Sequence, residues 1–481
     1  MTTLIDALKN ETNTTFTENG AVTLKSTLKD TVDFFGLGGA LRERTEQDIV
    51  KLFSKAFFED EIVTLRTLFY LRDIRGGQGE RRTFRVCLKW LAENYPEHVT
   101  ANFSNIFEYG RFDDVFALKD TPIWEPVVLQ TIKVIWNSVY EQNPNLMYKW
   151  LPSNNTSSKE TCKLANEITK YLGITPKQYR KRLSEKREQL RIVERDMCAK
   201  NWSAINYQSV PSRASLLYKK AFIKHDHERY IDFLAKVKSG EAKINAATLY
   251  PYDIVDDILN GEKDDTLEAL WNALPNYMEG DTSNSIVVAD VSGSMTGRPM
   301  AVSISLALYV SERNNGIFKN HFITFSSKPD LVAVKGNTLC EKVSNLERAS
   351  WEMSTNLEAV FNLVLNTAKK NNIPQSEMPT TLYIVSDMEF DQACSEPDKT
   401  LFQNIQKKYF TAGYEMPKLV FWNVNARNTQ VPMKFDQRGA CLVSGCSPAI
   451  LKTLLAGGTI TPEQVMLDTI NSGRYSMVTL P

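Results

Sequence analysis

The chain has 481 residues, and its 57 Lys and Arg are balanced by 57 Asp and Glu, so the formal net charge is zero. At roughly 100–200 residues per domain, this length predicts two to four domains. The 42% apolar content excludes wholesale disorder. The balanced charge argues against a protein that coats nucleic acid or membrane indiscriminately, although it leaves room for a local basic face.

The sequence carries no sign of export or of membrane insertion. Residues 1–20 lack a basic stretch followed by an apolar run, so we expect no signal peptide. The longest apolar runs are far shorter than the roughly 20 residues that span a bilayer. The seven cysteines are scattered and form no CxxC pair, which predicts buried thiols in a reducing compartment. We therefore expect a cytoplasmic protein without a membrane partner.

The first half of the chain has the apolar spacing of helices. Residues 1–25 are expected to be a flexible segment, and residues 26–275 an all-helical domain. For example, Ile49, Leu52, Phe53 and Phe57 recur at three- and four-residue steps. Successive helix–turn–helix units favour a HEAT-like array, but no repeat of fixed period is present, so the array is inferred from helix pairing alone.

The second half, residues 284–481, alternates short apolar runs with amphipathic stretches. This alternation predicts a doubly wound, Rossmann-like α/β domain with a mostly parallel sheet, so the fold class is α plus α/β. The expected strands are 285–290, 321–325, 331–334, 381–385, 419–423 and 441–443, and the expected helices are 300–313, 357–370, 399–409 and 448–455. A short turn precedes residues 331–334, which predicts an antiparallel edge strand.

Charge is distributed unevenly along the neutral chain. Residues 177–224 contain 13 Lys and Arg against 4 Asp and Glu, whereas residues 252–281 contain nine acidic residues and one lysine. One interpretation is a pair of solvated helix faces that pair with each other, and the other is a functional basic surface.

A cluster of oxygen-bearing side chains is expected at one edge of the sheet. Asp290 ends a buried strand, and Ser292 and Ser294 follow it on a tight loop. Thr355 precedes the helix that begins at Leu357, and Asp387 ends another buried strand. Ligands bind at the carboxyl edge of such sheets, and hard oxygen donors of this kind suit Mg²⁺ or Mn²⁺.

These five residues, in this order, resemble the metal-ion-dependent adhesion site of the von Willebrand factor A domain. The resemblance implies that Asp290, Ser292, Ser294, Thr355 and Asp387 hold Mg²⁺ or Mn²⁺ directly or through water. It also implies that one metal position stays open for an acidic group of a partner. An intact motif can also be a vestigial or purely structural metal site.

Basic and aromatic residues are interleaved in the helical half. This interleaving occurs at residues 148–150, 179–182 and 218–222. Basic side chains contact phosphates and aromatic rings stack on unpaired bases, but buried aromatics covered by Lys and Arg give the same pattern. The candidate RNA-binding residues are Lys149, Lys177, Arg180, Lys181, Arg182, Lys186, Arg187, Lys219 and Lys220.

The layout of helical repeats followed by an A-type domain resembles the Ro/TROVE family. More closely, it resembles an uncharacterised bacterial, viral and plant family, through residues 71–77, 108–114, 149–153 and 210–212. The Ro resemblance implies a ribonucleoprotein in which the helical repeats bind small noncoding or misfolded RNAs. The function expected is therefore non-catalytic RNA binding. The alternative is a metal-dependent interaction module that captures an acidic residue of a protein partner, without RNA.

Evidence for an enzyme is poor. A phosphatase that forms an aspartyl phosphate at Asp290 would need a second carboxylate at position 292, where a serine stands. Neither a G-x-S-x-G elbow nor a P-loop is present. A metal-dependent hydrolase is kept as a weaker alternative.

Overall fold

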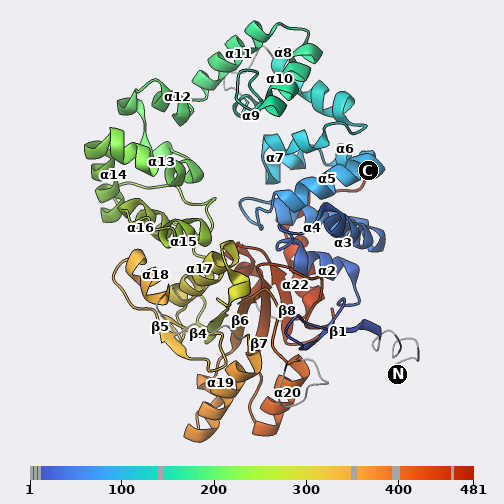
Figure 1. Ribbon diagram of the computed structural model, residues 1–481, viewed down its shortest axis with the longest axis vertical. Helices are drawn as coiled ribbons and strands as arrows, with labels where there is room; N and C mark the ends of the chain where they lie inside the picture. Colours follow the sequence, from blue (N-terminus) through green and yellow to red (C-terminus); the bar gives the residue numbers. More distant parts are fainter. Residues whose placement is uncertain are drawn as a thin grey trace. The chain divides into compact units, whose positions relative to one another are not determined.

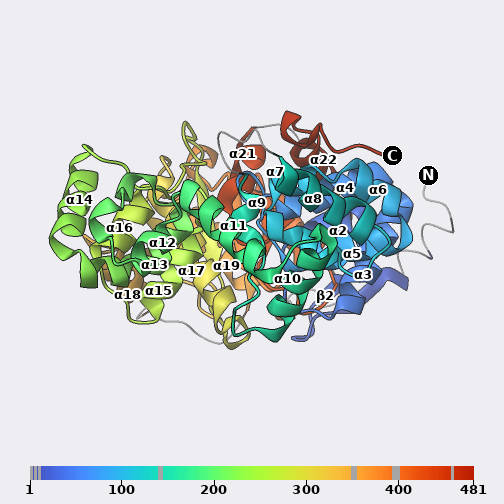
Figure 2. The same ribbon diagram turned by 90° about the horizontal axis from the view of Figure 1, so that it is seen from above.

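The computed structural model describes residues 4, 8, 12–138, 145–347, 355–392, 401–456 and 460–481. The chain divides into two compact units (Figures 1 and 2). The first, called the sheet unit here, contains Met1–Thr83 and Ala246–Ser476. The second, called the helical unit, contains Phe84–Asn245 and Met477–Pro481.

A six-stranded sheet forms the centre of the sheet unit (Figure 1). Its strands are β3 (Ser285–Ala289), β4 (His321–Thr324), β5 (Leu331–Ala333), β6 (Thr381–Ser386), β7 (Lys418–Asn423) and β8 (Ala440–Ser444). The order is β5-β4-β3-β6-β7-β8, and every pairing is parallel except the antiparallel edge pair β4–β5. The predicted mostly parallel sheet and its antiparallel edge strand are confirmed.

The helices of the sheet unit come from both ends of the chain. They are α2 (Asp30–Gly38), α3 (Glu46–Glu59), α4 (Glu61–Arg72), α15 (Pro251–Leu259), α16 (Asp265–Asn272), α17 (Arg298–Arg313), α18 (Leu339–Glu347), α19 (Leu357–Asn371), α20 (Leu401–Ala412), α21 (Leu451–Leu455) and α22 (Pro462–Ile470). Helix α17 packs against β3, β4 and β6, and α2 and α22 pack against β8.

Residues 30–72 therefore share a core with the sheet, although their sequence has the helical character of residues 84–245. Helix α2 approaches β8 so closely that a Cβ added at Gly36 would lie 3.1 Å from the Cβ of Leu442. Residues 14–24, which fall in the segment expected to be flexible, form a hairpin of β1 (Thr14–Phe16) and β2 (Val22–Leu24). Leu24 also bridges to Val431, so the hairpin is tied to the sheet unit.

The turn after α4 is held by a buried carboxylate. Asp73 accepts hydrogen bonds from Nε and Nη2 of Arg474, from the hydroxyl of Tyr475 and from the backbone N–H of Arg75. A buried carboxylate needs such partners, because an unpaired charge in the interior is costly. The contact links this turn to a segment 401 residues away.

The helical unit is built from short helices. They are α5 (Arg82–Asn94), α6 (Pro96–Ala101), α7 (Asn105–Tyr109), η1 (Phe112–Leu118), η2 (Trp124–Leu129), α8 (Gln130–Asn137), α9 (Met147–Trp150), α10 (Lys159–Leu172), α11 (Pro176–Gln189), α12 (Val193–Cys198), α13 (Ser212–His225) and α14 (His227–Ser239). The chain end joins them, because Asn102 and Asn105 donate to the carbonyls of Thr479 and Met477.

Substitution of Gly77 by alanine is expected to destabilise the sheet unit. A Cβ there would lie 1.9 Å from the carbonyl oxygen of Tyr70, so backbone would have to move. Overpacking of this kind costs about 1–3 kcal/mol, which calorimetry would detect as a lower melting temperature. Gly473→Ala is the matched control, since nothing lies within 4 Å of its added Cβ. Equal melting temperatures for the two variants would contradict the tight-turn account.

Candidate functional site

The predicted metal-site residues lie at the point where the chain stops adding strands on one side of β3 and begins to add them on the other side. From β3 the chain passes to β4 and β5 on one side, and then crosses to β6 on the other side of β3. Ala289 and Val385 are register partners, so Asp290 and Asp387 follow two adjacent parallel strands at one edge. A crevice forms outside the carboxyl ends of the strands at such a switch point, and ligands bind there.

Asp290 and the two serines form one compact loop. One carboxylate oxygen of Asp290 accepts from the backbone N–H of Ser292 at 2.9 Å, and the other accepts from the hydroxyl of Ser386 at 2.7 Å. The Oγ atoms of Ser292 and Ser294 lie 3.0 Å apart. The loop thus gathers two hydroxyls beside a fully buried carboxylate.

Asp387 has hydrogen-bonding capacity that its neighbours leave unused. Its Oδ1 accepts from the backbone N–H of Glu389, whereas its buried Oδ2 accepts no hydrogen bond within the described part of the chain. The nearest cation to Oδ2 is Nη1 of Arg427 at 3.8 Å, too long for a hydrogen bond. An orphaned buried carboxylate oxygen of this kind fits a divalent cation with oxygen ligands.

Thr355 contacts the loop that follows β6. Its Oγ1 lies 2.8 Å from the carbonyl oxygen of Glu389 and 3.1 Å from Oδ1 of Asp391. Its neighbour Ser354 lies outside the described residues. The structure therefore brings Thr355 to the loop of Asp387, and Ser292 and Ser294 to the loop of Asp290.

The two aspartates interact electrostatically. Burial raises the pKa of Asp290 to about 6, and the negative charge of Asp387 adds to the rise. Hydrogen bonds from Ser292 and Ser386 act in the opposite direction. Two buried carboxylates that raise each other's energy in this way favour the uptake of either a proton or a metal ion. Among the described residues, His, Cys, Asp and Glu form no metal cluster of three or more, so the candidate site depends on its hydroxyl ligands.

The N-terminal hairpin covers part of this edge, which the sequence did not indicate. The amide of Asn19 donates to Oγ1 of Thr355 at 3.1 Å and to the carbonyl of Glu389 at 2.7 Å. The carboxylate of Glu389 accepts from the backbone N–H of Glu18, and Glu18 also pairs with Arg427 at 2.7 Å. These partners are separated by more than 330 residues, so no local pattern could have revealed them.

The predicted RNA-binding residues are unequally exposed. Lys177, Arg180, Lys181 and Lys220 are exposed, and the side chain of Lys181 is 78% accessible. Lys219 is only 4% exposed and therefore lies beneath the surface. Lys149, Arg182, Lys186 and Arg187 are partly buried and are used within the unit. One example is Arg182, which donates to the carbonyl of Trp136.

Most aromatics interleaved with these basic residues belong to the core. Tyr148 and Tyr179 are fully buried, and Tyr179 stacks on Trp136 with ring centroids 5.2 Å apart. Arg182 lies over Trp136 and Lys186 over Tyr148. Of the two interpretations of the pattern, these segments show buried rings that are covered by basic side chains. The rings of Tyr148 and Tyr179 are therefore not free to stack on bases.

The acidic stretch lies in the sheet unit, and several of its carboxylates accept hydrogen bonds within that unit. Asp253 and Asp264 accept from backbone N–H groups at the first turns of α15 and α16. Glu268 accepts from the backbone N–H of Leu339 at 2.6 Å. Carboxylates at helix N-termini satisfy unpaired backbone donors and suit the helix dipole.

Fold and site together define a two-unit protein with a helical unit and an α/β sheet whose carboxyl edge carries a cluster of Asp, Ser and Thr. Residues 17–113 and 145–285 match a family described as domain of unknown function DUF2828, and residues 284–476 match domain of unknown function DUF7788. The chain is also 30% identical to uncharacterized protein L728 of Acanthamoeba polyphaga mimivirus, over 95% of this chain and 87% of that protein. The chain belongs to the same family as this viral protein.

No helix in the described ranges combines the length and the apolar character needed to cross a bilayer.

Removal of the Glu389 carboxylate is expected to loosen the hairpin. In Glu389→Ala, the donors of Glu18, Asn428 and Gln430 would lose their acceptor, at a cost of about 1–3 kcal/mol. Hydrogen–deuterium exchange of residues 14–24 should accelerate by about fivefold or more. Glu415→Ala, at an exposed position of the same unit, should leave exchange unchanged. Unchanged protection in Glu389→Ala would show that other contacts hold the hairpin.

Proposed function

We propose that the protein is a non-catalytic RNA-binding protein that holds RNA on the helical unit. The observation that carries this proposal is the basic surface of α11, which has six Lys and Arg against two Glu over Pro176–Gln189. Lys and Arg bind phosphates with little dependence on sequence and with strong dependence on salt. Small noncoding or misfolded RNAs are the proposed partners, in line with the resemblance of the layout to the Ro/TROVE family.

The local contacts of α11 leave much of its charge available. Lys181 makes a loose pair with Glu185 at 3.9 Å, and Arg180 makes a long hydrogen bond to Oδ1 of Asn154 at 3.5 Å. Exposed pairs of this kind contribute little stability and break readily in favour of a phosphate. The exposed residues Lys177, Arg180, Lys181 and Lys220 are therefore the proposed contact set, with the partly buried basic residues supporting them from below.

Charge reversal on α11 should weaken RNA binding. The triple substitution Lys177→Glu, Arg180→Glu and Lys181→Glu should reduce affinity for single-stranded RNA at least tenfold. It should also lower the slope of log affinity against log salt by about two, because each single-strand phosphate contact contributes roughly 0.7. Fluorescence anisotropy over a salt series measures both.

The matched control reverses three other charges in the same unit. Lys236, Lys238 and Lys243 are exposed on or just after α14. Their replacement by Glu changes the net charge equally and should reduce affinity far less. Equal losses for the two triple variants would mean that only the overall charge matters, and would contradict the placement on α11.

We also propose that the sheet unit binds Mg²⁺ or Mn²⁺ through Asp290, Ser292, Ser294, Thr355 and Asp387, as in a von Willebrand factor A domain. The unpartnered Oδ2 of Asp387 and the paired hydroxyls of Ser292 and Ser294 support the proposal. A bound metal would supply positive charge to the two buried carboxylates and an open position for an acidic group. We place the protein in the cytoplasm, since the six described cysteines are all free thiols.

Magnesium should stabilise the wild-type chain and not a variant that lacks the site. A ligand present at 100 times its dissociation constant adds about 2.7 kcal/mol, so millimolar Mg²⁺ should raise the melting temperature of the sheet unit by several degrees. Asp387→Asn should abolish the rise, whereas Glu377→Gln, at an exposed residue of the same unit, should retain it. The same rise in Asp387→Asn would place the bound ion elsewhere.

The second candidate function is capture of an acidic protein partner at this metal site, without RNA. It is favoured by the same unpartnered oxygen and by Arg427, whose side chain is 38% exposed beside Asp387 and can pair with a carboxylate, as it does with Glu18. Such binding would be abolished by a chelator and would depend little on salt. RNA binding on α11 has the opposite signature.

A further inference from the structure

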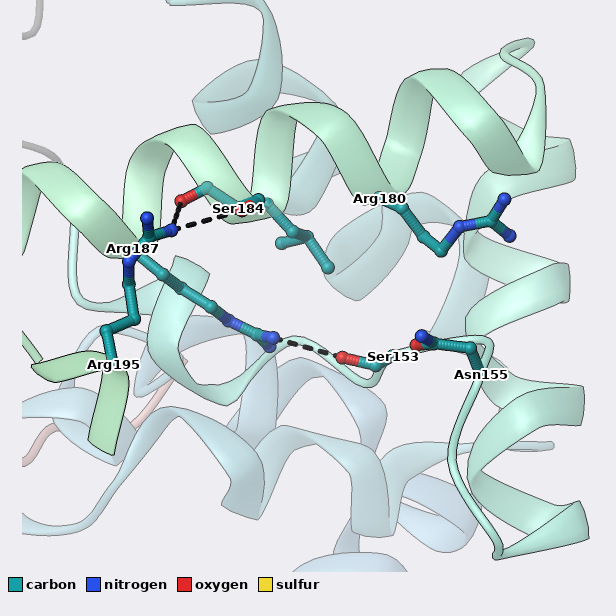
Figure 3. Close-up of a pocket in the computed structure, with 7 residues that line it drawn as sticks. Ser153, Asn155, Arg180, Ser184, Arg187 and Arg195 are labelled. Atoms are coloured by element: carbon teal, nitrogen blue, oxygen red, sulfur yellow. Dashed lines mark hydrogen bonds between the residues drawn. The ribbon is translucent and has the colours of Figure 1, made fainter. Parts of the chain in front are cut away.

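A pocket of about 350 Å³ lies in the helical unit, between the segment before α10 and one face of α11 (Figure 3). Polar side chains line most of it, namely Ser153, Asn155, Arg180, Ser184, Arg187 and Arg195. Its volume is at the lower end of the range for small-molecule sites. It can hold one nucleotide but not a duplex.

Arg187 is the fixed element of the pocket. Its guanidinium donates to the carbonyls of Tyr148 and Leu151 at 2.9 and 2.7 Å, and to Oγ of Ser153 at 3.0 Å. These contacts use three of its five N–H donors, and no carboxylate of the described part of the chain pairs with it. Burial lowers the pKa of this guanidinium below its usual value, as expected for a cation without a counter-charge.

Two further arginines extend the positive charge along the pocket. Arg195 donates to the carbonyl and hydroxyl of Ser184 and pairs with Glu188 at 3.1 Å. Arg180 lies two helical turns before Arg187, about 10 Å along the axis. In Figure 3, Arg180 and Arg195 lie toward opposite ends, with the guanidinium of Arg187 between them. Three guanidinium charges against one carboxylate leave a surplus of two positive charges.

We propose that this pocket binds one nucleotide unit of single-stranded RNA through the phosphates on both sides of its ribose. An internal nucleotide is flanked by two phosphodiesters, each with one negative charge, which match the surplus of two. Because the guanidiniums are spread along the pocket, two separated phosphates fit them better than one phosphate does. Ser153 and Asn155 offer hydrogen-bonding groups to the ribose hydroxyl.

The proposal deepens the RNA-binding function and rests on it. The pocket has no aromatic side chain among the residues that line it, so the base is not stacked there and base identity should matter little. The recognised chemistry is the sugar–phosphate backbone, and the strand must be single to place one unit in so small a pocket.

Adenosine 3′,5′-bisphosphate is the minimal probe, because it carries phosphates on both sides of one ribose. Titration calorimetry with the full chain should show about tenfold tighter binding of this bisphosphate than of adenosine 5′-monophosphate, since one charge-assisted contact is lost in the latter. Arg180→Gln should remove the difference. Lys238→Gln, at an exposed position of α14 in the same unit and outside the pocket, should preserve it.

A competition experiment separates this inference from the function on which it rests. The bisphosphate should displace a labelled single-stranded RNA from the wild-type chain. RNA that binds but is not displaced, or equal affinities for bisphosphate and monophosphate, would overturn the pocket assignment and leave RNA binding intact. Bisphosphate binding without any RNA binding would overturn RNA as the occupant and, with it, the proposed function.

Discussion

Asp387 is buried and Arg187 is partly buried, and each retains hydrogen-bonding capacity that the described residues do not use. In Asp387, one carboxylate oxygen accepts no hydrogen bond from the described residues and has only a distant guanidinium nearby. In Arg187, three donors hold the backbone while the charge has no carboxylate partner. Because uncompensated buried charge is costly, such groups are typical of sites that an external ion or ligand completes.

The two groups lie in different compact units, and their charges are opposite. They therefore mark two separate candidate sites, one for a cation and one for an anion. The strand ends of the sheet unit carry two buried aspartates, which suit a cation, whereas the pocket and the exposed face of α11 are basic and suit phosphates. The discontinuous sheet unit explains how residues from both ends of the chain support the acidic strand ends, with the hairpin of residues 14–24 placed against Thr355 and Glu389. The proposed RNA binding and the proposed metal binding should therefore be separable by salt and by chelator.

Much of the sheet was predictable because parallel strands buried on both faces are continuous apolar runs. The sequence predicted the ends of the strands at 285–289 and 381–386 to within one residue. It also predicted the aspartates that follow these strands. By contrast, the helical pattern of residues 30–72 could not show that α2 packs on β8, because the partner surface is about 400 residues away. The same limit applies to Asn19, Glu389 and Arg427 at the candidate metal site.

Periodicity also could not distinguish an exposed aromatic from a buried one beside a lysine or arginine. Tyr148 and Tyr179 stand in basic segments, yet both are core residues. The arginine pocket depends on which side of α11 faces residues 153–155, and this is set by tertiary packing around Trp136 and Tyr179. The surplus of charge in this stretch was visible in the sequence, but the way in which it is organised was not.

Recovery of the purified protein with its copurifying nucleic acid tests the central claim most directly. The absorbance ratio and sequencing of the bound fraction would be compared after washes with high salt and with a chelator of Mg²⁺. RNA binding on the helical unit predicts a defined population of small RNAs that high salt removes and the chelator does not. A preparation free of nucleic acid at low salt would contradict it and would direct the search to acidic protein partners of the sheet unit.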